Sequence, residues 1–210
     1  MQQGPIIHVV DDDESFRTAL VRMLRAANYE VRTYANAGDF LLRPPEAAPG
    51  CILLDVRMPG PSGLTLQEAL VAQPEPLPVI FLSGHGDVPT AVRAMKSGAV
   101  DFLTKPVERK ALLEAIERAL ARDAQARAAR QRLRAWRNRY NGLTAREVEI
   151  FERVVSGKMN KEIADELGAA ERTIKAHRAN VMEKMEAGSV AELVQIAEAL
   201  HANASAAPRV

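Results

Sequence analysis

Residues 51–60 read Cys-Ile-Leu-Leu-Asp-Val-Arg-Met-Pro-Gly, and this stretch decides the fold. Cys51–Leu54 are four consecutive apolar residues, the pattern of a strand that is covered on both faces of a sheet. Asp55 follows directly, so a carboxylate stands at the carboxyl end of that strand. Sheets covered on both faces are parallel, and their sites form at the carboxyl ends of the strands.

Apolar runs of the same kind lie on both sides of this stretch. They predict four further strands, at residues 5–10, 29–34, 78–82 and 99–103. Apolar residues at helical spacing predict a helix after each strand, around residues 16–24, 37–42, 64–71 and 88–97 and from 109 onward. Five strands that alternate with five helices predict an α/β fold with a doubly wound, five-stranded parallel sheet.

Charge is unevenly distributed along the chain. The 210 residues include 28 basic and 27 acidic ones, so the total charge does not indicate a nucleic-acid partner. Residues 118–139, however, contain eight Arg and one Asp, a net charge of +7. The stretch from 109 to 140 lacks Gly and Pro and is rich in helix-forming Ala, Arg and Gln, which predicts a long helical linker.

The linker carries four arginines on one helical face, Arg127, Arg130, Arg134 and Arg137. A solvated face is the favoured interpretation, and contact with DNA phosphates is the alternative. The predicted boundaries are an N-terminal domain over residues 1–120, the linker over 121–141 and a C-terminal domain over 142–210.

The C-terminal domain is predicted to be all-α. Thr144 and Glu147 have the spacing of a capping box, in which a hydroxyl and a Glu three residues later start a helix. Glycines at 157, 168 and 188 separate four predicted helices, over residues 144–156, 160–167, 171–186 and 189–201. The tail from Asn203 to Val210 is predicted to lack regular structure.

Cysteine usage and hydropathy limit the compartment. Cys51 is the only cysteine, so no intrachain disulfide can form, which fits a reducing cytoplasm. No signal-peptide pattern is present at the start, and no apolar run reaches the roughly 18–20 residues of a membrane helix. We expect a cytoplasmic protein without a membrane partner.

Acids gather where two of the predicted strands end. Residues 11–13 are three consecutive Asp at the end of the first strand, and Asp55 ends the third. Adjacent carboxylates repel one another unless a cation pairs with them, and oxygen ligands favour Mg²⁺. Ser83 and Lys105 end the fourth and fifth strands, so a hydroxyl and an ammonium join the same edge. A carboxylate in such a place can accept a phosphoryl group.

Four motifs carry a resemblance over roughly residues 5–120. Val10-Asp11-Asp12, residues 54–60, Leu82-Ser83-Gly84 and Thr104-Lys105-Pro106 together resemble the receiver domain of two-component response regulators. The resemblance implies that Asp55 accepts a phosphoryl group from a sensor histidine kinase. It also implies a Mg²⁺ site and a switch, with Asp11, Asp12, Asp55 and the Arg57 backbone carbonyl as metal ligands, Ser83 and Lys105 on the phosphoryl oxygens and Phe102 as the switch aromatic.

The receiver motifs are most similar to the FixJ subgroup. Residues 84–89 and 91–102 carry this narrower resemblance. It implies that a face with Val92, Lys96 and Asp101 pairs two phosphorylated receivers. A Lys96–Asp101 pair across a two-fold axis would be self-complementary.

The C-terminal half resembles the NarL/LuxR-type helix-turn-helix. The blocks that carry this resemblance are residues 143–147, 160–164 and 172–177. It implies that the helix over 171–186 enters the major groove of double-stranded DNA. The implied DNA contacts are Lys161, Arg172, Thr173, Lys175, Ala176, Arg178 and Ala179.

Together these expectations predict a phosphorylation-activated, DNA-binding transcription regulator. Its expected partners are a sensor kinase, double-stranded DNA and, when phosphorylated, a second copy of the chain, with RNA polymerase as a further candidate. One alternative is a constitutive DNA-binding protein whose receiver never turns over phosphate. The other is an enzyme with a substrate of its own, but the chain lacks a Walker motif and a catalytic triad, so we do not expect an enzyme.

Overall fold

The computed structural model describes residues 4–43, 48–84 and 88–205. Its chain divides into two compact units, Met1–Arg127 and Ala128–Val210. The division lies inside the segment 121–141, which is helical throughout.

A five-stranded parallel sheet forms the centre of the first unit. Its strands are β1 (Ile6–Val10), β2 (Glu30–Tyr34), β3 (Gly50–Asp55), β4 (Val79–Ser83) and β5 (Asp101–Thr104). Their order is β2-β1-β3-β4-β5, and every neighbouring pair is parallel. The order reverses direction between β1 and β3, so the carboxyl ends of these two strands flank the usual position of a site in such sheets. The predicted doubly wound fold is confirmed.

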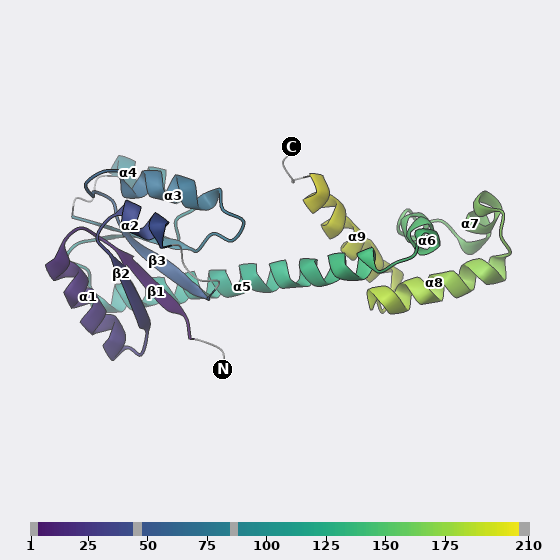
Figure 1. Ribbon diagram of the computed structural model, residues 1–210, viewed down its shortest axis with the longest axis horizontal. Helices are drawn as coiled ribbons and strands as arrows, with labels where there is room; N and C mark the ends of the chain where they lie inside the picture. Colours follow the sequence, from purple (N-terminus) through teal and green to yellow (C-terminus); the bar gives the residue numbers. More distant parts are fainter. Residues whose placement is uncertain (1–3, 44–47, 85–87, 206–210) are drawn as a thin grey trace. The chain divides into compact units, whose positions relative to one another are not determined.

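Helices cover both faces of this sheet (Figure 1). They are α1 (Glu14–Ala26), α2 (Ala37–Leu42), α3 (Gly63–Val71), α4 (Val88–Lys96) and the first part of α5 (Arg109–Asn141). Side chains of α1 and α5 pack with one set of strand residues, and those of α2, α3 and α4 pack with the other. All residues of β1, β3 and β4 are buried, because both faces of the inner strands are covered.

The fifth strand begins two residues later than the sequence predicts. Gly98 adopts a positive φ of 89° at the end of α4, and the Ala99 N–H donates to the Ala94 carbonyl at 3.1 Å, as in a Schellman cap. Ala99 therefore belongs to the C-terminal cap of α4 and not to β5. The apolar pattern of 99–103 could not separate this buried cap from a strand.

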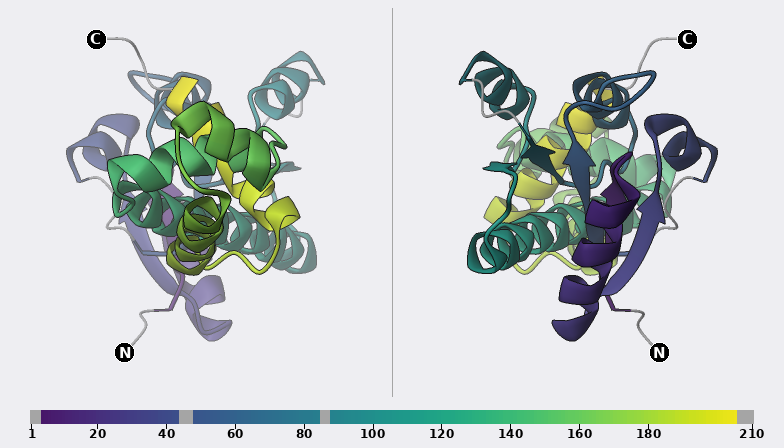
Figure 2. Two further views of the ribbon diagram at one scale, coloured as in Figure 1. Left: turned by 90° about the vertical axis from the view of Figure 1, so that its right-hand side faces the viewer. Right: turned by 90° about the vertical axis from the view of Figure 1, so that its left-hand side faces the viewer.

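Up to Ser205, where its described residues end, the second unit contains helices and no strand. They are α6 (Ala145–Val155), α7 (Asn160–Leu167), α8 (Glu171–Met185) and α9 (Val190–Ser205), coloured green to yellow in Figure 2. The end of α5 completes this unit, because Leu133, Trp136 and Tyr140 pack against its core. The Tyr140 hydroxyl also donates to Glu152 Oε1 at 3.0 Å.

The last helix is longer than the sequence predicts. The prediction of no regular structure is wrong for residues 203–205, which continue α9, and residues 206–210 lie outside the described part of the chain. The Asn203 side chain donates to the Ala199 carbonyl at 3.0 Å. The repeated Ala residues favour helix here at no side-chain entropy cost.

The arginine stripe of the linker helix is not uniform. Arg127 is half-buried, its Nε donates to Asp123 Oδ2 at 2.7 Å, and its guanidinium also donates to the Ala48 carbonyl at 2.6 Å. Arg134 and Arg137 are exposed, and Arg130 is half-buried. The sequence interpretation did not anticipate this pairing of Arg127 with the acid four residues before it.

Candidate functional site

Three carboxylates meet at the carboxyl edge of the sheet. Asp11 and Asp12 follow β1, Asp55 ends β3, and one oxygen of each lies within 4.8 Å of the others. Asp11 and Asp55 are buried, with 0% and 5% of their surfaces exposed, whereas Asp12 is exposed. The site thus combines two buried carboxylates, Asp11 and Asp55, with one carboxylate that faces solvent, Asp12.

Lys105 bridges the two buried carboxylates. Its Nζ lies 2.6 Å from Asp11 Oδ2 and 3.0 Å from Asp55 Oδ1. Lys105 follows β5, two strands away from β3 in the sheet, and its peptide bond to Pro106 is cis. Burial lowers the pKa of Lys105, but the hydrogen bonds and charges of the two Asp residues outweigh that effect and raise the pKa above its ordinary value. The ammonium is therefore charged.

The environment of Asp55 favours its neutral form. Burial raises the pKa of Asp55 above the ordinary 3.8, and Lys105 offsets part of this rise. The charges of Asp11 and Asp12 raise it further. An ionised Asp55 is thus held at a cost in free energy, and added positive charge at this edge would relieve it.

The backbone around Asp55 is tightly fitted. The Arg57 N–H donates to Asp55 Oδ2 at 3.2 Å, which orients the carboxylate. The Gly63 N–H donates to the Val56 carbonyl at 3.1 Å, and a Cβ on Gly63 would lie 2.1 Å from the Asp55 carbonyl oxygen. Only glycine therefore lets α3 begin so close to the strand end.

The expected switch residues lie on the adjoining strands. Ser83 is buried at the end of β4, and Phe102 on β5 is half-buried. The Phe102 ring lies 6.3 Å from the Phe81 ring, centroid to centroid, at the edge of the core between the sheet and α2–α4. The structure thus puts Ser83 and Lys105 at the same sheet edge as Asp55, and it puts Phe102 on β5, two strands away from β3.

The donor set fits a hard divalent cation. All three side chains offer carboxylate oxygens, and the described part of the chain has no Cys or His in this cluster that would favour zinc. Three carboxylates and one ammonium leave a net negative charge, which a divalent cation would balance.

The α4–β5 face carries the residues expected to pair two receivers. Val92 is 46% exposed, and Lys96 is exposed on the same helix. Asp101 pairs with Arg118 Nη2 at 2.5 Å within the chain. A partner's lysine would therefore meet an acid that already has one cationic neighbour.

The sequence analysis missed what Asp13 and Arg17 do. The Asp13 side chain accepts a hydrogen bond from the Phe16 N–H at 3.0 Å and caps α1. The Arg17 guanidinium donates to the Asp11 carbonyl at 2.5 Å, so the first turn of α1 is tied to the site. The Asp13–Phe16 spacing of an N-cap was readable from the sequence, but Asp13 was interpreted only as a neighbour of the metal ligands and was given no role.

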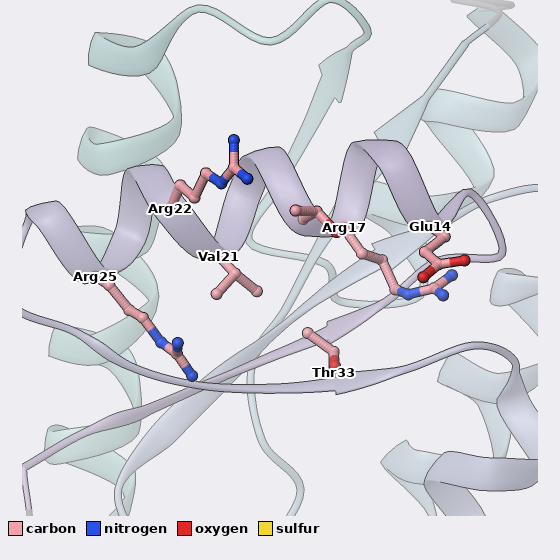
Figure 3. A pocket seen from close by; sticks show the side chains of 7 residues that line it. Glu14, Arg17, Val21, Arg22, Arg25 and Thr33 are labelled. Atoms are coloured by element: carbon pink, nitrogen blue, oxygen red, sulfur yellow. The ribbon is translucent and has the colours of Figure 1, made fainter.

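A pocket of about 340 Å³ lies beside α1, on the side of the helix toward Thr33 of β2 (Figure 3). It is lined by α1 residues and by Thr33 of β2, and Val21 stands in its wall between the arginines of the helix. It contains none of the three clustered carboxylates. Arg17 lines this pocket and also donates to the Asp11 carbonyl at the acidic site.

The helix-turn-helix is formed by α7 and α8. Gly168 ends α7 with a positive φ of 59°, and the Ala169 N–H donates back to the Ala164 carbonyl at 3.0 Å. Ile163 and Ile174 are fully buried where the two helices meet the core. The turn therefore needs the glycine that the sequence placed there.

Most of the expected DNA contacts are exposed. They are Lys161 on α7 and Arg172, Thr173, Lys175, Ala176 and Ala179 on α8. Arg178 differs, because it is half-buried and its Nη1 donates to Asn160 Oδ1 at 2.8 Å, which links the two helices. Its availability to a base or phosphate is accordingly reduced.

Glu147, in the capping box of α6, makes contacts that we expect to be sensitive to acid. Glu147 is 4% exposed and accepts hydrogen bonds from Lys184 Nζ at 2.7 Å and from the Thr144 N–H at 2.8 Å. These bonds lower the pKa of Glu147 from 4.5 to about 2, with Lys184 contributing most. A lowered pKa means that the stabilisation is present above pH 4.5 and is lost as the pH falls toward 2.

We expect Glu147→Gln to destabilise this unit by about 1.5–3 kcal/mol at pH 7, the range for hydrogen bonds to charged groups. The loss of stability between pH 4.5 and 2 should also become shallower than in the wild type. Trp136 is the only tryptophan and packs in this unit, so its fluorescence follows the unfolding. An unchanged acid limb in the variant would contradict the assignment to Glu147.

The fold and the site define a class: a receiver-type α/β domain joined to a helix-turn-helix domain. Two family models agree with this. The response regulator receiver domain matches residues 7–117, and the LuxR family of bacterial regulatory proteins matches residues 141–197. The chain belongs to the response regulators with a LuxR-type DNA-binding domain, and it is a transcription regulator that phosphorylation activates.

Named relatives cover nearly the whole chain. Response regulator protein TodT of Pseudomonas putida strain F1 is 42% identical, over 94% of this chain and 87% of that protein. Transcriptional regulatory protein FixJ of Bradyrhizobium diazoefficiens is 43% identical, over 91% of this chain and 93% of that protein. A low-resolution structure of the response regulator StyR superposes with a TM-score of 0.81 at 45% identity and covers 93% of this chain and 99% of that one. The resemblance to the FixJ group is confirmed.

Proposed function

We propose that Asp55 is the residue that accepts the phosphoryl group from a sensor histidine kinase. The observation that carries the proposal is the convergence of Asp11, Asp12, Asp55 and Lys105 at one sheet edge. An oxygen of Asp55 attacks phosphorus and forms a P–O bond, while the bond from phosphorus to the histidine nitrogen of the donor breaks. The product is an acyl phosphate on the end of β3.

We assign Asp11, Asp12, Asp55 and the Arg57 backbone carbonyl to a Mg²⁺ ion. When bound, Mg²⁺ supplies the positive charge that offsets the phosphoryl oxygens. Lys105 adds a second positive charge within hydrogen-bond reach of Asp55, and Ser83 offers a hydroxyl at the neighbouring strand end. Both act by holding the equatorial oxygens as the new bond forms.

The switch then involves the next strand. In our proposal the Ser83 hydroxyl moves toward the phosphoryl oxygens, Phe102 turns inward, and the face with Val92, Lys96 and Asp101 pairs two receivers. The exposure of Val92 supports this, as does the half-buried position of Phe102 against the core. Pairing brings two DNA-binding domains to one operator, which raises affinity through effective concentration.

For DNA contact we propose the exposed face of α8 in the major groove. Lys175 and Ala176 are our candidates for base contact, and the exposed residues Lys161, Arg172 and Thr173 are our candidates for phosphate contact. Ala179 adds apolar surface, and Arg178 acts first as the link to Asn160.

Sedimentation with and without a phosphoryl mimic tests the mechanism. With Mg²⁺ and beryllofluoride, the wild type should shift from monomer to dimer, and Asp55→Ala should not. If beryllofluoride binds at Asp55 without any shift, dimerisation through α4–β5 is wrong. If it does not bind, Asp55 is not the acceptor, and the constitutive DNA-binding alternative is favoured.

The remaining expectations extend this proposal. We infer a cytoplasmic protein with RNA polymerase as a further partner and no enzymatic substrate of its own. None of the helices that the structure describes is long and apolar enough to cross a membrane.

A further inference from the structure

The Lys105 ammonium has a third neighbour besides its two carboxylates. Its Nζ lies over the ring of Phe16, 4.2 Å from the ring centroid. A cation at that distance from an aromatic face is attracted by the ring quadrupole, and more strongly where water is excluded. The Lys105 side chain is only 20% exposed. The ring of Phe16 on α1 therefore contacts the charged group that also pairs with Asp11 and Asp55.

Hydrogen bonds of the acidic residues after β1 hold Phe16 in position. The Asp13 N–H donates to Asp11 Oδ1 at 3.0 Å, and the Asp13 side chain in turn accepts from the Phe16 N–H at 3.0 Å. Arg17 ties the next residue to the Asp11 carbonyl. Phe16 is thus fixed in the first turn of α1 relative to the same Asp11 that binds Lys105.

We propose that Phe16 is a positioning residue for phosphoryl transfer to Asp55. It acts through Lys105 and does not touch the reacting atoms. This inference rests on the proposed role of Asp55 as acceptor.

The contacts of Lys105 change during phosphoryl transfer. The two carboxylates that hold Lys105 are also the proposed metal and phosphoryl groups, so their hold on the ammonium weakens when these bind. The ring carries no charge and binds neither. It is therefore the neighbour that keeps the ammonium in reach of Asp55 through the whole reaction, which limits the reorganisation needed at transfer.

Aromatic and aliphatic replacements of Phe16 separate this role from simple packing. With acetyl phosphate and Mg²⁺ as the donor system, Phe16→Leu should lower the second-order rate constant for phosphorylation about 3- to 30-fold, as expected for a cation–π contact. Phe16→Tyr and Phe16→Trp should stay within about two-fold of wild type, because they keep a π face. Val21→Ala, which removes apolar volume from the same helix, serves as the matched control and should leave the rate unchanged.

A second readout does not depend on phosphorylation. The side-chain protons of Lys105 should be shifted upfield by the ring current in the wild-type NMR spectrum, and this shift should vanish in Phe16→Leu and persist in Phe16→Tyr. If the shift is present but no variant or wild-type protein takes up phosphate, the acceptor proposal fails and the contact stands. If the shift is absent, the contact itself is wrong.

The double-mutant cycle with Lys105→Met completes the test. In that background Phe16→Leu should cause no further loss of rate, because the ring no longer has a cation to hold. A loss equal to that in the wild-type background would overturn the proposal in favour of packing. If Phe16→Leu unfolds, Phe16→Met replaces it, because methionine retains flexible apolar volume. Phe16→Met should show the same reduction in rate, and its Lys105 protons should lose the ring-current shift.

Discussion

Asp55→Asn should abolish phosphorylation and at the same time make the receiver more stable at pH 7 in metal-free buffer. The first effect is a loss of labelling by acetyl phosphate to below detection, since an amide is not a nucleophile of this kind. The second follows from the raised pKa of Asp55, which burial causes and Lys105 only partly offsets. An acid whose pKa is raised on folding destabilises the folded state when it is ionised.

The effect of Asp55 on the stability of the receiver depends on pH. The favourable contribution of Asp55 is complete below its ordinary pKa of 3.8 and is lost as the pH rises through its higher folded value. The amide in the Asp55→Asn variant does not ionise, so the variant does not lose this stability as the pH rises. We expect the Tm of the receiver transition to be higher in Asp55→Asn than in the wild type at pH 7, and each 1 kcal/mol of added stability would raise the Tm of a small domain by about 4–8 °C.

Calorimetry of the full chain measures this shift in Tm. Repeating the comparison of Asp55→Asn with wild type over a range of pH provides the control. The difference between Asp55→Asn and wild type should shrink as the pH falls toward 4 and Asp55 becomes protonated. A variant that is less stable than wild type at pH 7 would show that the ion pair with Lys105 outweighs burial. Added Mg²⁺ should narrow the difference at pH 7 by stabilising only the wild type.

The order of the elements and the position of the site could both be predicted from sequence. The apolar run at 51–54 and the acids at 11–13 and 55 have patterns that depend on local sequence and strand topology, so their meeting at one edge follows from a parallel sheet. The apolar spacing of the C-terminal helices is equally local. Their boundaries agree with the structure to within one or two residues, apart from the end of α9.

What the sequence did not reveal depends on contacts between distant residues. The ring of Phe16 meets Lys105 across 89 positions of chain, and Asp123 meets Gly50 across 73. No periodic pattern encodes such a pair. Asp123 did carry a signal, because it is the single acid among eight arginines in residues 118–139, but its partner could be identified only from coordinates.

Asp123→Ala should destabilise the receiver by about 3–5 kcal/mol, the usual cost of removing one partner from a buried ion pair. Asp123 is 1% exposed, and its Oδ2 accepts both the Gly50 N–H at 3.0 Å and Arg127 Nε at 2.7 Å. Without it, a buried backbone donor and a guanidinium whose side chain is 19% exposed both lose an acceptor. The contact holds α5 to the first residue of β3, the strand that ends in Asp55.

Hydrogen exchange of the full chain measures this effect locally. Amides of β3 and of residues 118–127 should exchange faster in Asp123→Ala, while Gln125→Ala, an exposed change on the same turn, should leave them as in wild type. Pairing Asp123→Ala with Arg127→Met should recover part of the lost stability, because the second change removes the uncompensated charge. If the double variant is less stable than Asp123→Ala by the full cost of Arg127→Met alone, the two side chains are not coupled, and Arg127 is held by the Ala48 carbonyl instead.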